Sequence, residues 1–387
     1  MSCFAAALVL FLCAWLALFS APTSILWIVA IVVTEWGHWV ALAAVFLAVV
    51  SFASDRSRLG KITAALALAA AFLCALPSIR ALTIARDLPQ RCVSAFGTSA
   101  REAARAVPFS IVDLFRGIRM DAVDVTEYVY AQEGNKQLTL NLYQAKGTHD
   151  RRPVVLMVHG GSWTSGTKDQ LPAMNRYLAQ EHYAVVSINY RHAPKFHSPA
   201  PVEDVFRAIS FLKENAERLL LDTERIVLIG RSAGGQIALS AAYAGTEPAI
   251  RGVVAFYAPA DLVFGYEFPS RRGVLDSKKV LEDYLGGAPN EKPDAYTDAS
   301  AINFVKASTP PTLLIHGQLD PIIWPKQSER LAARLQTAGV PHLYLALPWA
   351  THGCEANLSG PSGQLSLYAV DQFLAAVLQP EQARGLR

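Results

Sequence analysis

The sequence predicts a chain of two parts: a helical membrane region, then an α/β unit built on a mainly parallel, doubly wound sheet. The first observation is charge. The 387 residues include 35 basic and 32 acidic side chains, yet only six of these charges lie within residues 1–85. The whole chain is 17% charged, whereas soluble domains average about 25%. The second observation is that short apolar runs alternate with segments of helical period from residue 123 onward, a pattern typical of a sheet with helices on both faces.

The front of the chain contains three apolar runs. Residues 3–21 form an uninterrupted run of 19, which is long enough to cross about 30 Å of hydrocarbon as a helix. No Lys or Arg precedes this run, and that favours a retained anchor over a cleaved signal peptide. Residues 25–53 are too long for one upright helix, so we expect a tilted crossing or a break near Gly37. With the third run, 62–79, the sequence predicts an integral membrane protein with three spans.

Orientation depends on the charges between these runs. The loop 54–61 holds three basic residues, which predicts that it lies in the cytoplasm. Three arginines between residues 80 and 91 favour the opposite orientation. Three spans with a cytoplasmic 54–61 loop place the rest of the chain on the non-cytoplasmic side. Glu35 and His38 are either a proton or ion site or, as we favour, an interfacial polar pair at a helix break.

The predicted domains are a transmembrane helical region over 1–85, a juxtamembrane connector or cap over 86–120, and an α/β domain over 121–387. The connector region is rich in arginine, so it is a lipid-binding stretch, a solvated connector, or helices folded over the next domain. After residue 85 the chain carries 31 basic and 30 acidic residues, a balance that argues against nucleic-acid binding. The five cysteines include no CxxC pair, so neither a disulfide framework nor a zinc site is predicted.

The α/β unit begins with two alternating segments, 124–130 and 137–143, on either side of Gly134-Asn135, which predicts an antiparallel hairpin. Buried strands are predicted for the apolar runs 154–158, 184–188, 226–229, 253–257, 313–315 and 343–347. Helices are predicted for 171–180, 201–219, 236–243 and 326–336. Ligands on such sheets bind at the carboxyl ends of the strands, so the functional residues are expected there.

A candidate nucleophile follows the run 226–229. The chain continues Gly230-Arg231-Ser232-Ala233-Gly234 into a predicted helix. A strand-to-helix turn this tight needs small residues on both sides of the serine. It would hold the Ser232 hydroxyl above the sheet edge, near the N-terminus of the following helix, where negative charge is stabilised.

A serine hydroxyl needs a base, and the base needs an acid that orients it. Asp320 follows the run 313–315, and His352 follows the run 343–347. Both are therefore expected at the same sheet edge as Ser232. Asp261 also follows a predicted strand and is the weaker candidate for the acid. His342 precedes a strand and should lie at the opposite edge.

A third segment supplies backbone donors. The run 154–158 ends in His159-Gly160-Gly161-Ser162-Trp163, where the glycine pair lets N–H groups turn toward an oxyanion. We expect the N–H groups of Gly161, Ser162 and Ala233 to form an oxyanion hole, and Trp163 to line the substrate pocket. His159 and His316 each precede a glycine at a strand end and are interpreted as packing or hydrogen-bonding residues.

These motifs carry a resemblance. From about residue 123 to 378 the chain resembles the α/β-hydrolase superfamily and, within it, the hormone-sensitive-lipase-like carboxylesterases. The matching segments are His159-Gly160-Gly161-Ser162-Trp163, Asn189-Tyr190-Arg191-His192-Ala193-Pro194, Gly230–Gly235, Asp320 and His352-Gly353. Two positions depart from the family pattern: Ser162 stands where a third glycine is usual, and Arg231 stands where many members have an acid.

The resemblance implies a serine hydrolase that cleaves carboxylic esters through an acyl-serine, without a metal or organic cofactor. A membrane anchor makes small-molecule or lipid esters with apolar acyl groups the expected substrates, and membrane lipid an expected partner. An amidase or peptidase with the same triad, an acyltransferase, and an inactive membrane-embedded binding or transport protein remain alternatives. Residues 262–300 and 90–120 are candidates to cap the pocket. The sequence does not determine the oligomeric state.

Overall fold

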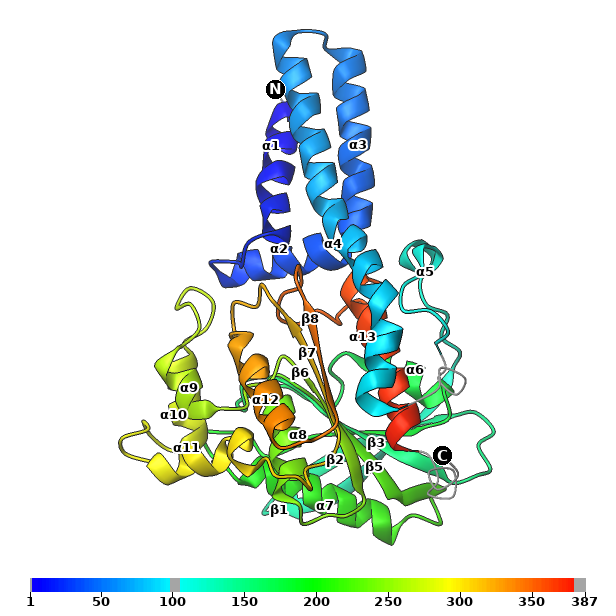
Figure 1. Ribbon diagram of the computed structural model, residues 1–387, viewed down its shortest axis with the longest axis vertical. Coiled ribbons are helices and arrows are strands. Elements are labelled where there is room, and N and C mark those ends of the chain that lie inside the picture. The colour runs from blue at the N-terminus through cyan, green and yellow to red at the C-terminus, as the bar shows by residue number, and fades with distance from the viewer. Residues whose placement is uncertain (1, 98–104, 379–387) are drawn as a thin grey trace.

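The computed structural model describes residues 2–97 and 105–378. Figure 1 shows a column of helices standing on an α/β domain, residues 123–378. The front helices are α1 (Ser2–Ala14), η1 (Trp15–Ala17), α2 (Ser24–Glu35), α3 (Gly37–Ser54) and α4 (Arg58–Phe96). In the picture α1, α3 and the first part of α4 run side by side, and α2 lies across their base next to the α/β domain. Residues 98–104 of the predicted connector and 379–387 of the predicted domain lie outside the described residues.

The break expected near Gly37 is confirmed, because α2 ends at Glu35 and α3 begins at Gly37. A Cβ on Gly37 would lie 2.4 Å from the carbonyl oxygen of Cys74, so only glycine allows α3 to start this close to α4. The run 3–21 is helical only as far as Ala17. The chain then turns into α2, whose first turn is capped by the Thr23 hydroxyl.

Helix α4 is longer than the predicted span 62–79 and continues to Phe96 with two prolines inside it. Its second half packs on the α/β domain, where Leu88 and Cys92 are fully buried and the Arg91 guanidinium donates a hydrogen bond of 2.7 Å to the carbonyl of Tyr344. Of the three alternatives for the connector, the structure therefore shows a helix folded over the domain for residues 86–96. A short helix, α5 (Ile111–Arg116), follows.

Within residues 2–97 and 105–378, α3 and α4 are the helices that are long and apolar enough to cross a membrane. The segments Cys3–Ala17 and Ser24–Glu35 are apolar but shorter.

The α/β domain is built on one eight-stranded sheet with the order β1-β2-β4-β3-β5-β6-β7-β8. The strands are β1 (Val123–Glu133), β2 (Lys136–Ala145), β3 (Arg152–Val158), β4 (Ala184–Ile188), β5 (Leu221–Arg231), β6 (Ile250–Phe256), β7 (Thr312–Gly317) and β8 (His342–Leu347). Strand β2 pairs antiparallel with β1 and with β4, and the remaining pairs are parallel. The predicted hairpin, all six predicted strands and the mainly parallel α/β fold are confirmed.

Helices cover both faces of the sheet. The helices of the domain are α6 (Pro172–Gln180), α7 (Ala200–Glu214), α8 (Ala233–Ala244), α9 (Leu262–Glu267), α10 (Ser277–Leu285), α11 (Pro293–Ala299), η2 (Ala301–Phe304), α12 (Lys326–Thr337) and α13 (Pro361–Val377). Alternate side chains of β3 point to opposite faces: Leu156 packs in the core under α7, α8 and α12, while Val155 and Met157 pack in the core under α6, α13 and α4. The second half of α4 is thus part of the domain core.

Candidate active site

Ser232 lies in the turn between β5 and α8 with a φ of 52°, a left-handed conformation that is strained for a residue with a side chain. Its N–H donates to the carbonyl of Phe256 at 2.9 Å, which fixes the turn against β6. A Cβ on Gly230 would lie 2.2 Å from the carbonyl oxygen of Gly234, and one on Gly234 would lie 2.2 Å from that of His159. Both glycines are therefore required by the close backbone approach, as the sequence pattern predicts.

His352 and Asp320 lie together at the same edge, after β8 and β7. The His352 Nδ1 atom and the Asp320 Oδ2 atom are 2.6 Å apart. The other carboxylate oxygen of Asp320 accepts the backbone N–H groups of Ile322 and Ile323 at 2.7 and 2.9 Å. Burial alone would raise the pKa of Asp320, but the charge of His352 and hydrogen bonds from His316 and His352 hold it well below its ordinary value. Asp320 is therefore a carboxylate at neutral pH.

The competing acid is engaged elsewhere. Asp261 accepts the N–H of Phe264 at the start of α9 and pairs with Arg330 at 2.7 Å.

Three further histidines next to strands have hydrogen-bonding or packing partners, and one of them, His316, also lies 3.3 Å from the Asp320 carboxylate. His342 starts β8 and its Nδ1 contacts the carbonyl of Val340. His316 contacts the Ser328 hydroxyl at 2.7 Å, and the ring of His159 stacks on Tyr190 with centroids 4.2 Å apart. Burial lowers the pKa of His159 to about 4.

The backbone turn after β3 exposes the predicted donors. Gly161 has a φ of 125° and Ser162 a φ of 55°, and the carbonyl of Gly161 accepts the N–H groups of Thr164 and Ser165. The neighbouring Gly160 N–H donates to the Gln170 side chain at 2.8 Å. In the described part of the chain, the N–H groups of Gly161, Ser162 and Ala233 have no protein acceptor. Ser162 thus keeps a backbone donor in the position where a third glycine is usual.

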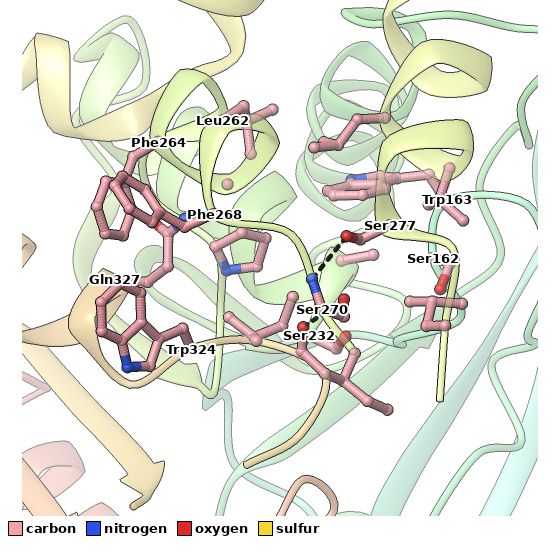
Figure 2. A pocket seen from close by; sticks show the side chains of 18 residues that line it. Ser162, Trp163, Ser232, Leu262, Phe264, Phe268, Ser270, Ser277, Trp324 and Gln327 are labelled. Atoms are coloured by element: carbon pink, nitrogen blue, oxygen red, sulfur yellow. Dashed lines mark hydrogen bonds between the residues drawn. The ribbon is translucent and has the colours of Figure 1, made fainter. Parts of the chain in front are cut away.

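Ser232 lies between two apolar cavities, which we name by the helix that walls each. The α10 cavity is lined by Ser162, Trp163, Ser232, Ala233, Pro259, Leu262, Phe264, Gly265, Phe268, Ser270, Leu275, Ser277, Val280, Leu281, Ile322, Ile323, Trp324 and Gln327, and Figure 2 shows this cavity from close by. The α2 cavity is lined by Trp27, Ile31, Gly160, Gly161, Ser162, Gln170, Leu171, Arg231, Ser232, Tyr257, Val274, Leu275, Ile322, His352, Gly353 and Ala356. Ser232 and His352 face the α2 cavity together, and the described residues show no hydrogen bond between their side chains. Serine–base contacts in such sites often tighten only when substrate is bound.

Trp163 lines the α10 cavity, with its ring stacked on Tyr284 at 4.5 Å and its indole N–H bonded to Gln236 at 2.8 Å. These two contacts fix the ring as a rigid wall. Residues from the predicted cap 262–300 line the same cavity. In contrast, none of the described residues between 90 and 120 lines either cavity.

Arg231, the departure from the family pattern, has a buried partner that the sequence did not assign. Its guanidinium Nε lies 2.8 Å from the carboxylate of Glu355, and the Tyr257 hydroxyl donates to the same oxygen at 2.5 Å. The Tyr257 ring in turn packs against His352, with centroids 4.2 Å apart. Burial and the neighbouring Glu355 raise the pKa of Tyr257 well above its ordinary value. The ion pair between Arg231 and Glu355 therefore supports the loop that carries His352. In the sequence, the only signal for this role is that Glu355 lies three residues after His352.

The front helices also reach the site, which the sequence did not predict. The indole N–H of Trp27 in α2 donates a hydrogen bond of 2.9 Å to the backbone carbonyl of His352. No spacing in the sequence relates these residues, because 325 positions separate them.

Glu35 and His38 lie on either side of the break between α2 and α3, and their side chains contact different residues. Glu35 is fully buried at the end of α2, where its carboxyl group contacts the Ser362 hydroxyl at 2.6 Å and accepts the Ser362 N–H at 3.1 Å. Burial raises the pKa of Glu35 to about 8. The His38 ring packs edge-on against Phe115 at 5.1 Å. The helix break thus places Glu35 against the α/β domain.

Comparison with known proteins decides the family. The BD-FAE family matches residues 140–335, which is half of the chain and includes Ser232 and Asp320. The chain belongs to the BD-FAE family. It is 28% identical over 247 residues to the probable carboxylic ester hydrolase LipM of Mycobacterium tuberculosis, a match that covers 60% of this chain and 56% of that protein. It is 30% identical over 237 residues to the esterase LipQ of the same organism, covering 59% of this chain and 56% of LipQ.

Solved structures agree on the fold. A bacterial heroin esterase superposes with a TM-score of 0.59 at 24% identity, covering 68% of this chain and 87% of that one. An arylesterase superposes with a TM-score of 0.55 at 22% identity, covering 69% of this chain and 89% of that one. The expected α/β-hydrolase fold is confirmed. The matches to LipM and LipQ span a little over half of the length of those relatives.

Proposed function

We propose that this BD-FAE family member is a membrane-anchored serine hydrolase that cleaves carboxylic esters through an acyl-Ser232 intermediate. The observation that carries the proposal is the 2.6 Å contact between His352 and Asp320 beside a strained serine turn. The names of its relatives, a probable carboxylic ester hydrolase and an esterase, support the same chemistry.

In the proposed mechanism His352 Nε2 takes the proton of the Ser232 hydroxyl as the Ser232 oxygen attacks the ester carbonyl. The Asp320 carboxylate accepts the Nδ1–H of His352, which fixes the imidazole tautomer and stabilises the imidazolium that forms. His352 then gives its proton to the leaving alkoxide. Water attacks the acyl-serine by the same route, and the released acid leaves Ser232 protonated again.

The developing oxyanion is stabilised by backbone donors. Among the residues that the structure describes, the N–H groups of Gly161, Ser162 and Ala233 have no protein acceptor, and all three residues line a cavity together with Ser232. Each such donor contributes about 10²–10³ in rate. Because these donors belong to the backbone, the Ser162 side chain is not required for the chemistry.

We propose that α3 and the first part of α4 cross the membrane, with the shorter apolar helix α1 inserted beside them as the third predicted span. Helix α3 has 18 residues, which corresponds to about 27 Å and matches the hydrocarbon thickness of a bilayer. The connection between α3 and α4 lies at the end of this column that is farther from the α/β domain (Figure 1), and this connection and the first turn of α4 contain Arg56, Arg58 and Lys61. By the positive-inside rule that end is cytoplasmic and the α/β domain is not. If protease added to intact cells fails to cleave the α/β domain, while lysed cells allow cleavage, the proposed orientation is wrong.

The apolar lining of both cavities supports apolar ester substrates. The α10 cavity is walled by Trp163, Phe264, Phe268 and Trp324, and the polar side chains on its wall are neutral. An apolar acyl group would therefore be bound there without desolvating a charge.

The test is ester turnover with matched variants. We expect Ser232→Ala to lower the hydrolysis of ethyl butyrate at least about 10⁴-fold and to abolish labelling by a fluorophosphonate probe. Asp320→Asn should cost about 10³–10⁴-fold, because the imidazole loses its orienting carboxylate. Asp261→Asn, which removes the competing candidate acid, should stay within about twofold of the parent. Turnover that survives in Ser232→Ala would overturn the proposal, and an unlabelled parent protein would favour a non-catalytic binding role.

A further inference from the structure

Two apolar cavities meet at Ser232, and the proposed base lines only one of them. His352 lines the α2 cavity and does not line the α10 cavity. Under the proposed mechanism His352 must protonate the leaving alkoxide, so the alcohol part of the ester lies on the His352 side. The acyl part then lies in the α10 cavity. The chemistry thus assigns a direction to the substrate.

The wall of the alcohol side is supplied by a front helix. Trp27 and Ile31 of α2 line the α2 cavity, although the α/β domain starts about 90 residues later in the chain. Helix α2 is also fastened to the domain at both ends. Near its start, the Ser24 N–H donates to the carbonyl of Gly273 at 3.0 Å, and at its end Glu35 is bonded to Ser362.

The first turn of α2 also contacts the loop that carries His352, through the 2.9 Å hydrogen bond from the Trp27 indole to the His352 carbonyl. Helix α2 therefore has a structural role in the site and does more than join two spans.

The opposite side of α2 is apolar and uncovered. Ile25 is 74% exposed and Ile28 is 60% exposed. Helix α2 lies across the base of the column of apolar helices (Figure 1), at the level where the membrane surface would meet the domain if that column spans a bilayer. Helices that lie along a membrane surface bury an apolar side about 5–10 Å into the headgroup region.

We propose that α2 is an interfacial helix whose inner side builds the alcohol-binding half of the active site, so that the enzyme takes esters of long-chain apolar alcohols from the membrane surface. This inference rests on the proposed ester hydrolysis. It adds two points: α2 selects the alcohol half of the ester, and the substrate comes from the bilayer. Trp27 is a positioning residue, and Ile31 sets the size of the alcohol site.

The first test uses a pair of isomers, dodecyl butyrate and butyl dodecanoate, which have the same atoms and differ in the direction of the ester. We expect Ile31→Trp, which fills the α2 cavity, to lower kcat/KM for dodecyl butyrate at least about tenfold. It should change butyl dodecanoate by less than about twofold, because a filled pocket discriminates by size. Val280→Phe is the matched control in the α10 cavity and should produce the reverse preference.

Ethyl butyrate, whose two halves are both short, keeps the tests of the two proposals separate. If the thermal midpoints of Ile31→Trp and Val280→Phe match that of the parent, both variants are folded. Equal effects of Ile31→Trp on the two isomers, or none, would then overturn the assignment of the alcohol side while leaving the proposed function in place. A parent protein that leaves ethyl butyrate intact would overturn the proposed function instead. Should either variant fail to fold, Ile31→Phe and Val280→Leu repeat the test with smaller changes.

The second test concerns the membrane surface. The full chain is reconstituted in phosphatidylcholine vesicles that carry dodecyl butyrate in the bilayer. We expect Ile25→Asp combined with Ile28→Asp to lower hydrolysis at least about fivefold, with ethyl butyrate unchanged, because charges on this side oppose its burial among the headgroups. Phe304→Asp, at an exposed apolar residue of η2 in the α/β domain, should change neither substrate. Unaltered hydrolysis of the vesicle-borne ester by the α2 variant would overturn the membrane-surface part of the proposal.

Discussion

The front helices and the α/β domain are both rich in apolar residues, but they place large and small side chains in opposite ways. In the domain the buried residues are large: Leu156, Leu228 and Phe256 are fully inaccessible. Between the front helices the buried residues are mostly small. The cores there are dominated by Ala7, Ala14, Ala17, Ala44, Ala48, Ala64, Ala67, Ala70 and Ala71. The largest side chains point outward, and Phe46 is 71% exposed.

This difference is the one expected if the front helices lie in lipid, as proposed, and the α/β domain lies in water. In water the burial of large apolar side chains stabilises a fold, whereas in lipid there is no such gain and helices associate through close packing of small residues. Helix α2 and the second half of α4 belong to the front helices but also pack on the α/β domain. Helix α2 lines the active site, and α4 contributes to the domain core. These two segments join the proposed membrane anchor to the α/β domain.

The largest expected effect concerns charge inside the α/β domain. Arg231→Met leaves the Glu355 carboxylate buried without its cation, and breaking a buried ion pair in this way costs about 3–5 kcal/mol. The loss should appear as a lower thermal midpoint of the protein in detergent. Arg151→Met is the matched control, because its pair with Glu217 is exposed and worth less than about 1 kcal/mol. Equal midpoints for the two variants would mean that the Arg231–Glu355 pair does not stabilise the domain.

Enlarging or trimming buried side chains tests whether the α/β domain and the front helices are packed differently. In the α/β domain, Leu228→Ala creates a cavity and should cost about 2–5 kcal/mol. Between the front helices, the enlargement Ala67→Leu should cost about 1–3 kcal/mol, because close helix contact leaves no room. Trimming the outward side chain, Phe46→Ala, should change stability by less than about 0.5 kcal/mol. Thermal unfolding in one detergent measures all three, and a Phe46→Ala penalty as large as that of Leu228→Ala would contradict the two-solvent interpretation.

The smallest effect is a pH dependence at the junction. Glu35 has a pKa of about 8 when docked against an ordinary value of 4.5, so the folded state binds this proton more tightly than the unfolded state. Its contribution to stability is complete below about pH 4.5 and is lost as the pH rises through about 8. Between pH 6 and 9 the thermal midpoint of the parent should therefore fall by a few degrees more than that of Glu35→Gln, which cannot ionise. Parallel pH profiles would show that Glu35 is not protonated in the docked state.

Much of the site followed from local patterns. Ser232 was predicted because the turn around it needs glycines on both sides, and Asp320 and His352 because each follows a strand whose partners lie at the same sheet edge. Between Asp320 and Asp261 the sequence supported only a preference, because both follow strands. The structure separates them by their partners: Asp320 contacts His352, and Asp261 caps α9 and pairs with Arg330. Glu355 carried no periodic or motif signal, since its role depends on which side chain lies across the turn.

From the sequence alone, the two-part organisation, the mainly parallel sheet and the side chains of Ser232, Asp320 and His352 could be predicted. These features depend on periodicity and on short turns, which are local properties of the chain. The structure was needed to choose two helices over one tilted helix for residues 25–53. It was also needed to show that α4 packs in the core of the domain and that Trp27 is hydrogen-bonded to His352. These contacts join residues that are far apart in the sequence, as Trp27 and His352 are. No repeat or spacing in the sequence can therefore predict them.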